Sequence, residues 1–231
     1  TDHENGIYFA AFRVMAFSLV PAGILQSAFI PQLSRSLTLE DRQRFTEKYV
    51  MFTILFGAIF TAGIFTFSDY ITGISFGIDY RESSFILKLL MVTGLLAFIN
   101  VSYSAPLLAW NYEKKIFWAI VAGGLVDVVL NFLLIPQYGA MGAAVAAICT
   151  EGTVLIGLSI IMFSTIKKLY ITKIIILILY AVVATGTGYL LMINGFHQMI
   201  AASISLLIYI FINFIFKTIT ISEVRMYLTK K

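Results

Sequence analysis

Charged residues in this 231-residue sequence are gathered into short stretches, and the apolar runs between them are about twenty residues long. A helix of that length crosses the hydrocarbon core of a bilayer. Hydrophobic residues make up 60% of the chain and charged residues only 12%, about half the share in soluble globular proteins. A soluble fold of this length could not bury so much apolar surface. The sequence therefore predicts an all-α integral membrane protein.

The apolar runs predict about seven membrane-spanning helices in a single transmembrane domain over residues 1–231. The predicted spans are approximately 7–33, 49–68, 84–109, 115–135, 140–164, 172–193 and 198–216. Each of the two longest connections, 34–48 and 69–83, has room for one interfacial helix. No connection is long enough to form a separate domain.

The connections alternate between rich and poor in lysine and arginine. Thirteen of the sixteen basic residues lie in 34–48, 110–115, 165–173 and the segment after 216, whereas 69–83, 136–139 and 194–197 hold only Arg81. Basic connections stay on the cytoplasmic side of a membrane. This asymmetry predicts a multi-pass protein of the cell membrane with its C-terminus in the cytoplasm and its N-terminal end outside.

Several classes of function lack support in the sequence. The net charge of +4 comes from basic residues beside spans and does not indicate nucleic-acid binding. Cys149 is the single cysteine, and His3 and His197 both lie in outer segments, so no metal-ligand spacing is present. There is no glycine-rich phosphate loop. We expect no catalytic residue, metal or cofactor, and we expect that the protein is not an enzyme.

The stretch DVVLNFLLIPQYGAMGAAVAAICTEG, residues 127–152, predicts a tight helical hairpin. Pro136 disfavours continuation of the helix, and Gly139 and Gly142 permit a sharp reversal. After the turn, small residues recur every four positions, as in Gly142 and Ala146. Helices in lipid associate through such small residues because these residues allow close backbone approach.

Four ionisable residues lie within predicted spans: Arg13, Lys88, Asp127 and Glu151. Each costs at least a few kcal/mol in the membrane and is therefore a candidate for function. Asp127 and Glu151 are each twelve residues from Gly139, so at about 1.5 Å per residue both are expected about 18 Å from the turn. Lys88 is shallow enough to extend its ammonium to the interface.

These positions predict a hydrophilic cavity in which Arg13, Asn100 and Asn131 bind substrate and the carboxylates Asp127 and Glu151 carry a coupling ion or proton. Two alternatives remain open for the same residues. Each acid can be a neutral or ion-paired helix contact, and each asparagine can join helices without binding a ligand.

Three segments resemble the polysaccharide (Wzx-type) flippases of the superfamily that includes lipid II flippases and multidrug and toxin extruders (MOP/MATE-like). They are LNFLLIPQYGAMGAAVA (130–146), GIYFAAFRVMAFSLVPAGILQSAFIPQLSR (6–35) and SFGIDYRESSFIL (75–87). The resemblance extends through about residue 165. It implies a fold of two facing helical lobes, of which this chain supplies the C-terminal one and lacks the N-terminal one.

The resemblance also implies a function and partners. A protein of this family moves a lipid-linked oligosaccharide, of the polyprenyl diphosphate type, from the cytoplasmic to the outer leaflet. Its partners would be that lipid, the bilayer and the missing N-terminal lobe, with no nucleic acid. The alternatives are a cation-coupled drug extruder of the same superfamily and a non-transporting membrane scaffold for polysaccharide assembly.

Overall fold

The structure is a computed structural model that describes residues 2–77 and 82–216. The described residues form helices joined by short connections, without strands. The helices are α1 (Asp2–Ser18), α2 (Val20–Ser34), α3 (Leu39–Thr66), α4 (Ser68–Phe76), α5 (Ser83–Ala109), α6 (Glu113–Ile166), α7 (Ile171–Ile193) and α8 (Gln198–Ile215). The prediction of an all-α membrane protein is confirmed.

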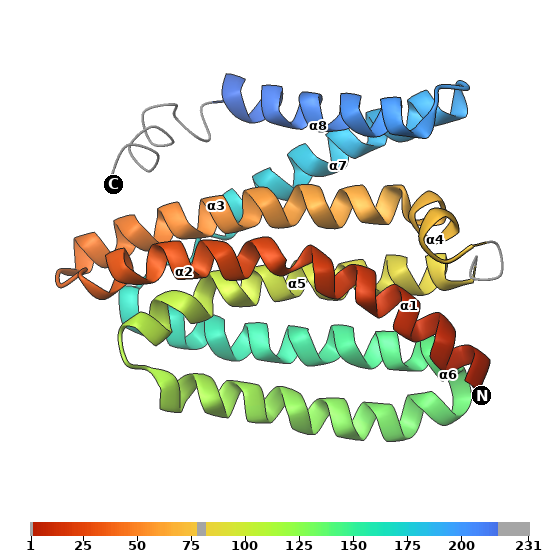
Figure 1. Ribbon diagram of the computed structural model, residues 1–231. Coiled ribbons are helices and arrows are strands. Elements are labelled where there is room, and N and C mark those ends of the chain that lie inside the picture. Colours follow the sequence, from red (N-terminus) through yellow and green to blue (C-terminus); the bar gives the residue numbers. More distant parts are fainter. Residues whose placement is uncertain (1, 78–81, 217–231) are drawn as a thin grey trace.

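Six helical segments of the described chain are long and apolar enough to cross a membrane. One of them is α6, whose 54 residues would extend about 80 Å if straight, more than twice the hydrocarbon thickness. Its backbone leaves the helical region at Gly139 (φ 52°, ψ −130°), where it reverses direction. Figure 1 shows the two halves of α6 lying antiparallel. The predicted hairpin is therefore confirmed, and it accounts for two of the seven expected spans.

The structure modifies two details of the predicted spans. The span expected over 7–33 agrees with one apolar segment long enough to cross a membrane, Asn5–Ser34, but the helix in it is divided at Leu19 into α1 and α2. Pro21 lies in the first turn of α2, where its missing N–H costs no helical hydrogen bond. In the hairpin, helix continues through Pro136, and the reversal occurs three residues later at Gly139.

The two longest connections contain helix. Most of 34–48 belongs to α3, which begins at Leu39 after Thr38 accepts a capping hydrogen bond from the Asp41 N–H. The connection expected over 69–83 contains α4, a short helix that packs against α5. The basic segment after residue 216 lies outside the described residues, as does Arg81.

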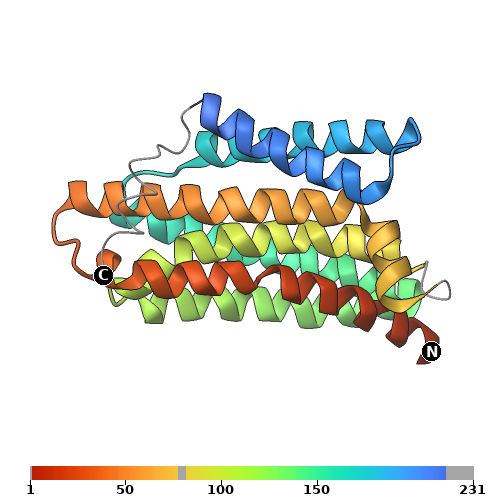
Figure 2. The same ribbon diagram turned by 45° about the horizontal axis from the view of Figure 1, so that its top comes forward.

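The helices pack in two groups. The pair α1–α2, together with α3, α5 and both halves of α6, forms a bundle, and α7 and α8 lie side by side on its flank (Figures 1 and 2). Helix α7 packs on α3, and α8 packs on α7. The largest core cluster joins α3, α5, α6 and α7 around buried Ile54, Phe98, Leu158 and Leu177.

The connections that are rich in basic residues meet at one end of the bundle (Figure 1). There the Trp110 Nε1–H donates to the Leu33 carbonyl over 2.9 Å, and the Arg42 guanidinium lies 4.9 Å from the Trp110 ring centre. Gln43 donates to the Ile166 carbonyl over 2.7 Å. Helix α4, the reversal at Gly139 and the α7–α8 connection lie at the opposite end.

Candidate functional site

Arg13 projects from α1, in the first apolar segment, and is exposed. Among the side chains that the structure describes, those of residues 5–77 and 82–216, the Arg13 guanidinium forms no ion pair, so it is not neutralised by Asp127 or Glu151 in this arrangement. An unpaired guanidinium in an apolar segment is costly unless it meets water, an anion or another polar surface. Arg13 is therefore available to an anion from outside the described chain.

Asp127 lies in the first half of α6 and is half-buried. Thr150, in the returning half, donates from Oγ1 to the Asp127 carboxylate over 3.0 Å and to the Ala146 carbonyl over 2.9 Å. This contact puts Asp127 level with Thr150, the neighbour of Glu151, as the equal distances from Gly139 predict. The described contacts of Asp127 thus include a hydroxyl partner and no cation.

Glu151 is held by α5. The Asn100 amide donates to the Glu151 carboxylate over 2.6 Å and to the Glu151 carbonyl over 3.0 Å. Asn100 is only 6% exposed, and its Oδ1 has no hydrogen-bond partner among the described residues. Glu151 is half-buried. The structure therefore brings Asn100 and Glu151 together, although they are 51 positions apart and the sequence did not predict this hydrogen bond.

Asn131 lies one turn after Asp127 on α6 and is half-buried. The five predicted residues thus lie on α1, α5 and the two halves of α6. Asp127 and Glu151 are on antiparallel halves of the hairpin, but their hydrogen bonds lead to different partners, Thr150 and Asn100. Shared function of the five residues remains a prediction.

Sequence reasoning missed the partner of Lys88. Its ammonium lies 3.1 Å from the carboxylate of Asp69 in α4. Ser84 also donates to Asp69, and this hydrogen bond, assisted by Lys88, holds the pKa of Asp69 below its ordinary value. No sequence pattern links Asp69 to Lys88, nineteen positions later, because the packing of α4 against α5 decides how the two meet.

Within the part of the chain that the structure describes, no three histidine, cysteine, aspartate or glutamate side chains are grouped so as to hold a metal ion. Cys149 is exposed and has no second thiol nearby, as expected for the single cysteine of the chain. The five residues predicted for the site offer one guanidinium, two carboxylates and two amides.

No protein-family model matches the sequence. The chain is 29% identical over 150 residues to a protein of Haloferax volcanii named as a probable low-salt glycan biosynthesis flippase, Agl15; the match covers 63% of this chain and 32% of that protein. It is 30% identical over 155 residues to an uncharacterised membrane protein of Methanocaldococcus jannaschii, MJ1375; that match covers 65% of this chain and 37% of MJ1375. The matched region is thus about a third of each relative's length.

The fold matches a solved structure, the lipid II flippase MurJ in an inward closed conformation, with a TM-score of 0.72. The match covers 91% of this chain and 47% of that protein, at 21% sequence identity. Sequence and fold similarity both lead to flippases, which are transporters rather than enzymes. This chain is therefore a multi-pass membrane protein with the fold of about half of a lipid II flippase.

Proposed function

We propose that the full-length protein is a flippase that moves a lipid-linked oligosaccharide from the cytoplasmic to the outer leaflet of the cell membrane, and that this chain is its C-terminal lobe. The observation that carries the proposal is Arg13, an exposed guanidinium without an acid partner in the described part of an apolar span. The similarity to a probable glycan flippase and the fold of a lipid II flippase support it.

A fixed guanidinium can replace part of the hydration that the diphosphate of such a lipid loses when it enters the membrane. A diphosphate cannot enter hydrocarbon unless other groups replace its hydration. The planar guanidinium donates two parallel hydrogen bonds to phosphate oxygens, and it stays charged at every physiological pH. In the proposal Arg13 binds the diphosphate while the sugars cross in the space between this lobe and the N-terminal one.

In the proposal, the carboxylates of Asp127 and Glu151 couple transport of the lipid to movement of a proton or cation. The described hydrogen bonds to Asp127 and Glu151 come from a hydroxyl and an amide, so neither carboxylate is neutralised by a described cation. A carboxylate in that state can accept a proton or a monovalent cation during transport. Asn131, one turn from Asp127, adds an amide for substrate or ion, and Asn100 orients Glu151.

The test uses Arg13→Ala and Arg13→Lys in the full-length protein. We expect Arg13→Ala to abolish glycan export at normal protein abundance and Arg13→Lys, which keeps the charge but not the planar fork, to retain part of it. Arg44→Ala is the matched control, since Arg44 is an exposed arginine at the basic end of the bundle. It should export normally.

Two outcomes would contradict the proposal. If Arg13→Ala lowers protein abundance, and neutralising Asp127 or Glu151 as well restores both abundance and export, Arg13 is a structural ion-pair partner. If Arg13→Ala leaves glycan export intact but makes cells sensitive to cationic drugs, the protein is a drug extruder.

A further inference from the structure

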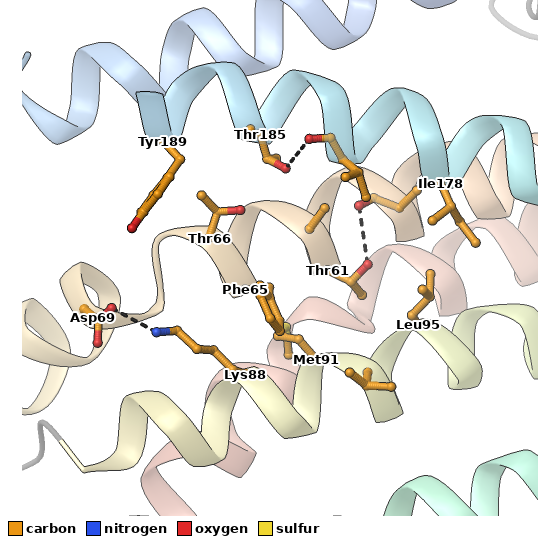
Figure 3. A pocket seen from close by; sticks show the side chains of 15 residues that line it. Thr61, Phe65, Thr66, Asp69, Lys88, Met91, Leu95, Ile178, Thr185 and Tyr189 are labelled. Carbon is orange, nitrogen blue, oxygen red and sulfur yellow. Dashed lines mark hydrogen bonds and ion pairs between the residues drawn. The ribbon is translucent and has the colours of Figure 1, made fainter. Parts of the chain in front are cut away.

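A pocket of about 600 Å³ lies away from the candidate site, between α3, α5 and α7 (Figure 3). None of Arg13, Asn100, Asp127, Asn131 or Glu151 lines it. Its walls are mostly apolar and include Ala58, Ala62, Met91, Leu95, Ile178 and Val182. The volume is in the range of about 300–1,000 Å³ that is typical of small-molecule sites.

The pocket opens at the surface of the helix bundle. Its lining includes Phe65 on α3, Val92 on α5 and Val182 on α7, which are 45%, 40% and 54% exposed. All three helices are long and apolar enough to span a membrane, and these exposed side chains at the mouth of the pocket are apolar. Water does not fill an apolar cavity, whereas a lipid chain in the same layer can enter it.

One end of the pocket carries opposite charges. The ammonium of Lys88 and the carboxylate of Asp69 both line it, 3.1 Å apart, and their side chains are 32% and 73% exposed. Figure 3 shows Tyr189 of α7 directed toward the same end. Asp69 can therefore accept a further donor, and Lys88 retains N–H groups for a further acceptor.

The charged end lies within two turns of the first residue of α5, the part of a spanning helix that is expected to meet the headgroups. Lys88 is five residues past Ser83, the first residue of α5, which is about 8 Å along the helix. The polar region of a bilayer is about 5–8 Å thick on each side of the hydrocarbon core. Leu95, at the apolar part of the pocket, lies seven residues beyond Lys88, about 10 Å farther.

We infer that this pocket binds one acyl chain of a phospholipid whose headgroup carries both a phosphate and an ammonium, as phosphatidylethanolamine does. The chain occupies the apolar part between α3, α5 and α7, the phosphate accepts from Lys88, and the ammonium donates to Asp69. An anionic lipid fits less well, because its phosphate would meet the Asp69 carboxylate with no ammonium to compensate it.

The test is photolabelling of the full-length protein in lipid nanodiscs. The probe is phosphatidylethanolamine with a diazirine on one acyl chain, compared with the phosphatidylglycerol analogue that carries the same chain. We expect the ethanolamine probe to label peptides around Leu95 and Ile178 and the glycerol probe to label them several-fold less.

Gly186→Leu tests the chain site, because Gly186 lines the pocket and an added Cβ there has no heavy atom within 4 Å. Labelling should fall about tenfold, the factor that displacing two methylenes from an apolar site implies. Gly124→Leu on α6 is the matched control, since its added Cβ also has open space but lies outside the pocket. It should label as the wild type does.

Asp69→Asn and Lys88→Met test the headgroup. Asp69→Asn should remove the preference for ethanolamine over glycerol, and Lys88→Met should weaken labelling by both probes. Equal labelling of the wild type by the two probes, or unchanged labelling of Gly186→Leu, would overturn the inference. So would cross-linking of this pocket to a protein segment outside the 231 residues, since that segment would then be the occupant.

Discussion

At the residue scale, the ionisable side chains within apolar helices have different kinds of partners. Lys88 is paired with a carboxylate, Glu151 with a buried amide, Asp127 with a hydroxyl and Arg13 with no acid in the described chain. A pair of opposite charges has no net charge to be compensated, whereas a charge held only by neutral groups can exchange a single ion. The proposed function therefore assigns roles to Glu151, Asp127 and Arg13, and none to Lys88.

Glu151→Gln separates the charge of Glu151 from its hydrogen bond. The glutamine carbonyl can still accept from Asn100, so we expect normal abundance and thermal stability. If Glu151 carries the coupling proton or cation, export by Glu151→Gln should no longer depend on the ion gradient. Asn100→Ala, by contrast, should lower stability by about 1 kcal/mol, which is typical of an interhelical hydrogen bond in a membrane. Export that keeps its full gradient dependence in Glu151→Gln would rule out a coupling role.

The ion pair of Asp69 and Lys88 predicts how the stability of the folded protein changes with pH. Because the folded-state pKa of Asp69 is below its unfolded value of about 3.9, the pair stabilises the protein above that pH and ceases to do so as pH falls through the folded pKa. Asp69→Asn should therefore lower the melting temperature at about pH 7 and at about pH 5, with a difference that shrinks toward about pH 3.

The effect of Asp69→Asn should be small, a few degrees at most, because exposed pairs contribute about 1 kcal/mol or less. Glu40→Gln, which changes an exposed acid at the other end of the bundle, is the control. A melting-temperature difference that grows as pH falls would contradict the assigned sign.

At the element scale, close backbone approach determines the hairpin of α6. A Cβ added to Gly123 would lie 2.5 Å from a Val154 methyl, and one added to Gly142 would lie 2.4 Å from the Leu134 carbonyl oxygen. Ala146 is fully buried, as the small-residue pattern predicts. The two halves of α6 therefore depend on glycine at the points where they touch.

The adjacent residues Gly123 and Gly124 provide a matched pair of substitutions. Gly123→Leu should destabilise the protein by about 1–3 kcal/mol through overpacking and lower the yield of folded protein. Gly124→Leu should be neutral or slightly stabilising, because its Cβ has open space and leucine favours helix more than glycine does. Thermal unfolding of both variants in detergent measures the difference. Equal stability would show that the halves of α6 are not in contact at Gly123.

At the scale of the whole molecule, the connections that are rich in lysine and arginine and those that are poor in them lie at opposite ends of one bundle. That segregation is what a fixed orientation in the membrane requires. The predicted cytoplasmic end is the end held together by Trp110, Gln43 and the ion pair of Lys168 with Glu47, 3.0 Å apart.

The orientation can be tested by cysteine labelling of the full-length protein in intact cells, after Cys149→Ser removes this chain's single thiol. Leu37→Cys lies in an exposed turn at the basic end, and Ser75→Cys is exposed on α4 at the other end. An impermeant maleimide should label Ser75→Cys from outside and should label Leu37→Cys only after the cells are opened. The reverse pattern would invert the orientation and the direction of transport.

The sequence by itself indicated that the protein lies in a membrane, that it is helical, approximately where its apolar segments lie, and that residues 127–152 form a hairpin. These follow from local properties: the length of apolar runs, the position of charges and the conformational freedom of Gly139. It also indicated the intramembrane ionisable residues, because any charge in such a run stands out against its neighbours. The sequence did not indicate the break at Leu19, and it predicted that the helix would stop at Pro136, because proline disfavours a helix without fixing where the helix ends.

Only the tertiary structure decided which polar groups meet. Asn100 reaches Glu151 across 51 positions, Asp69 reaches Lys88 across 19, and the apolar pocket arises where α7 packs on α3 beside α5. Each depends on how helices rotate and cross, which is set by the summed packing of many side chains rather than by any local pattern. For that reason the sequence could identify Asp127 and Glu151 as unusual, but not the hydroxyl and the amide that hold them.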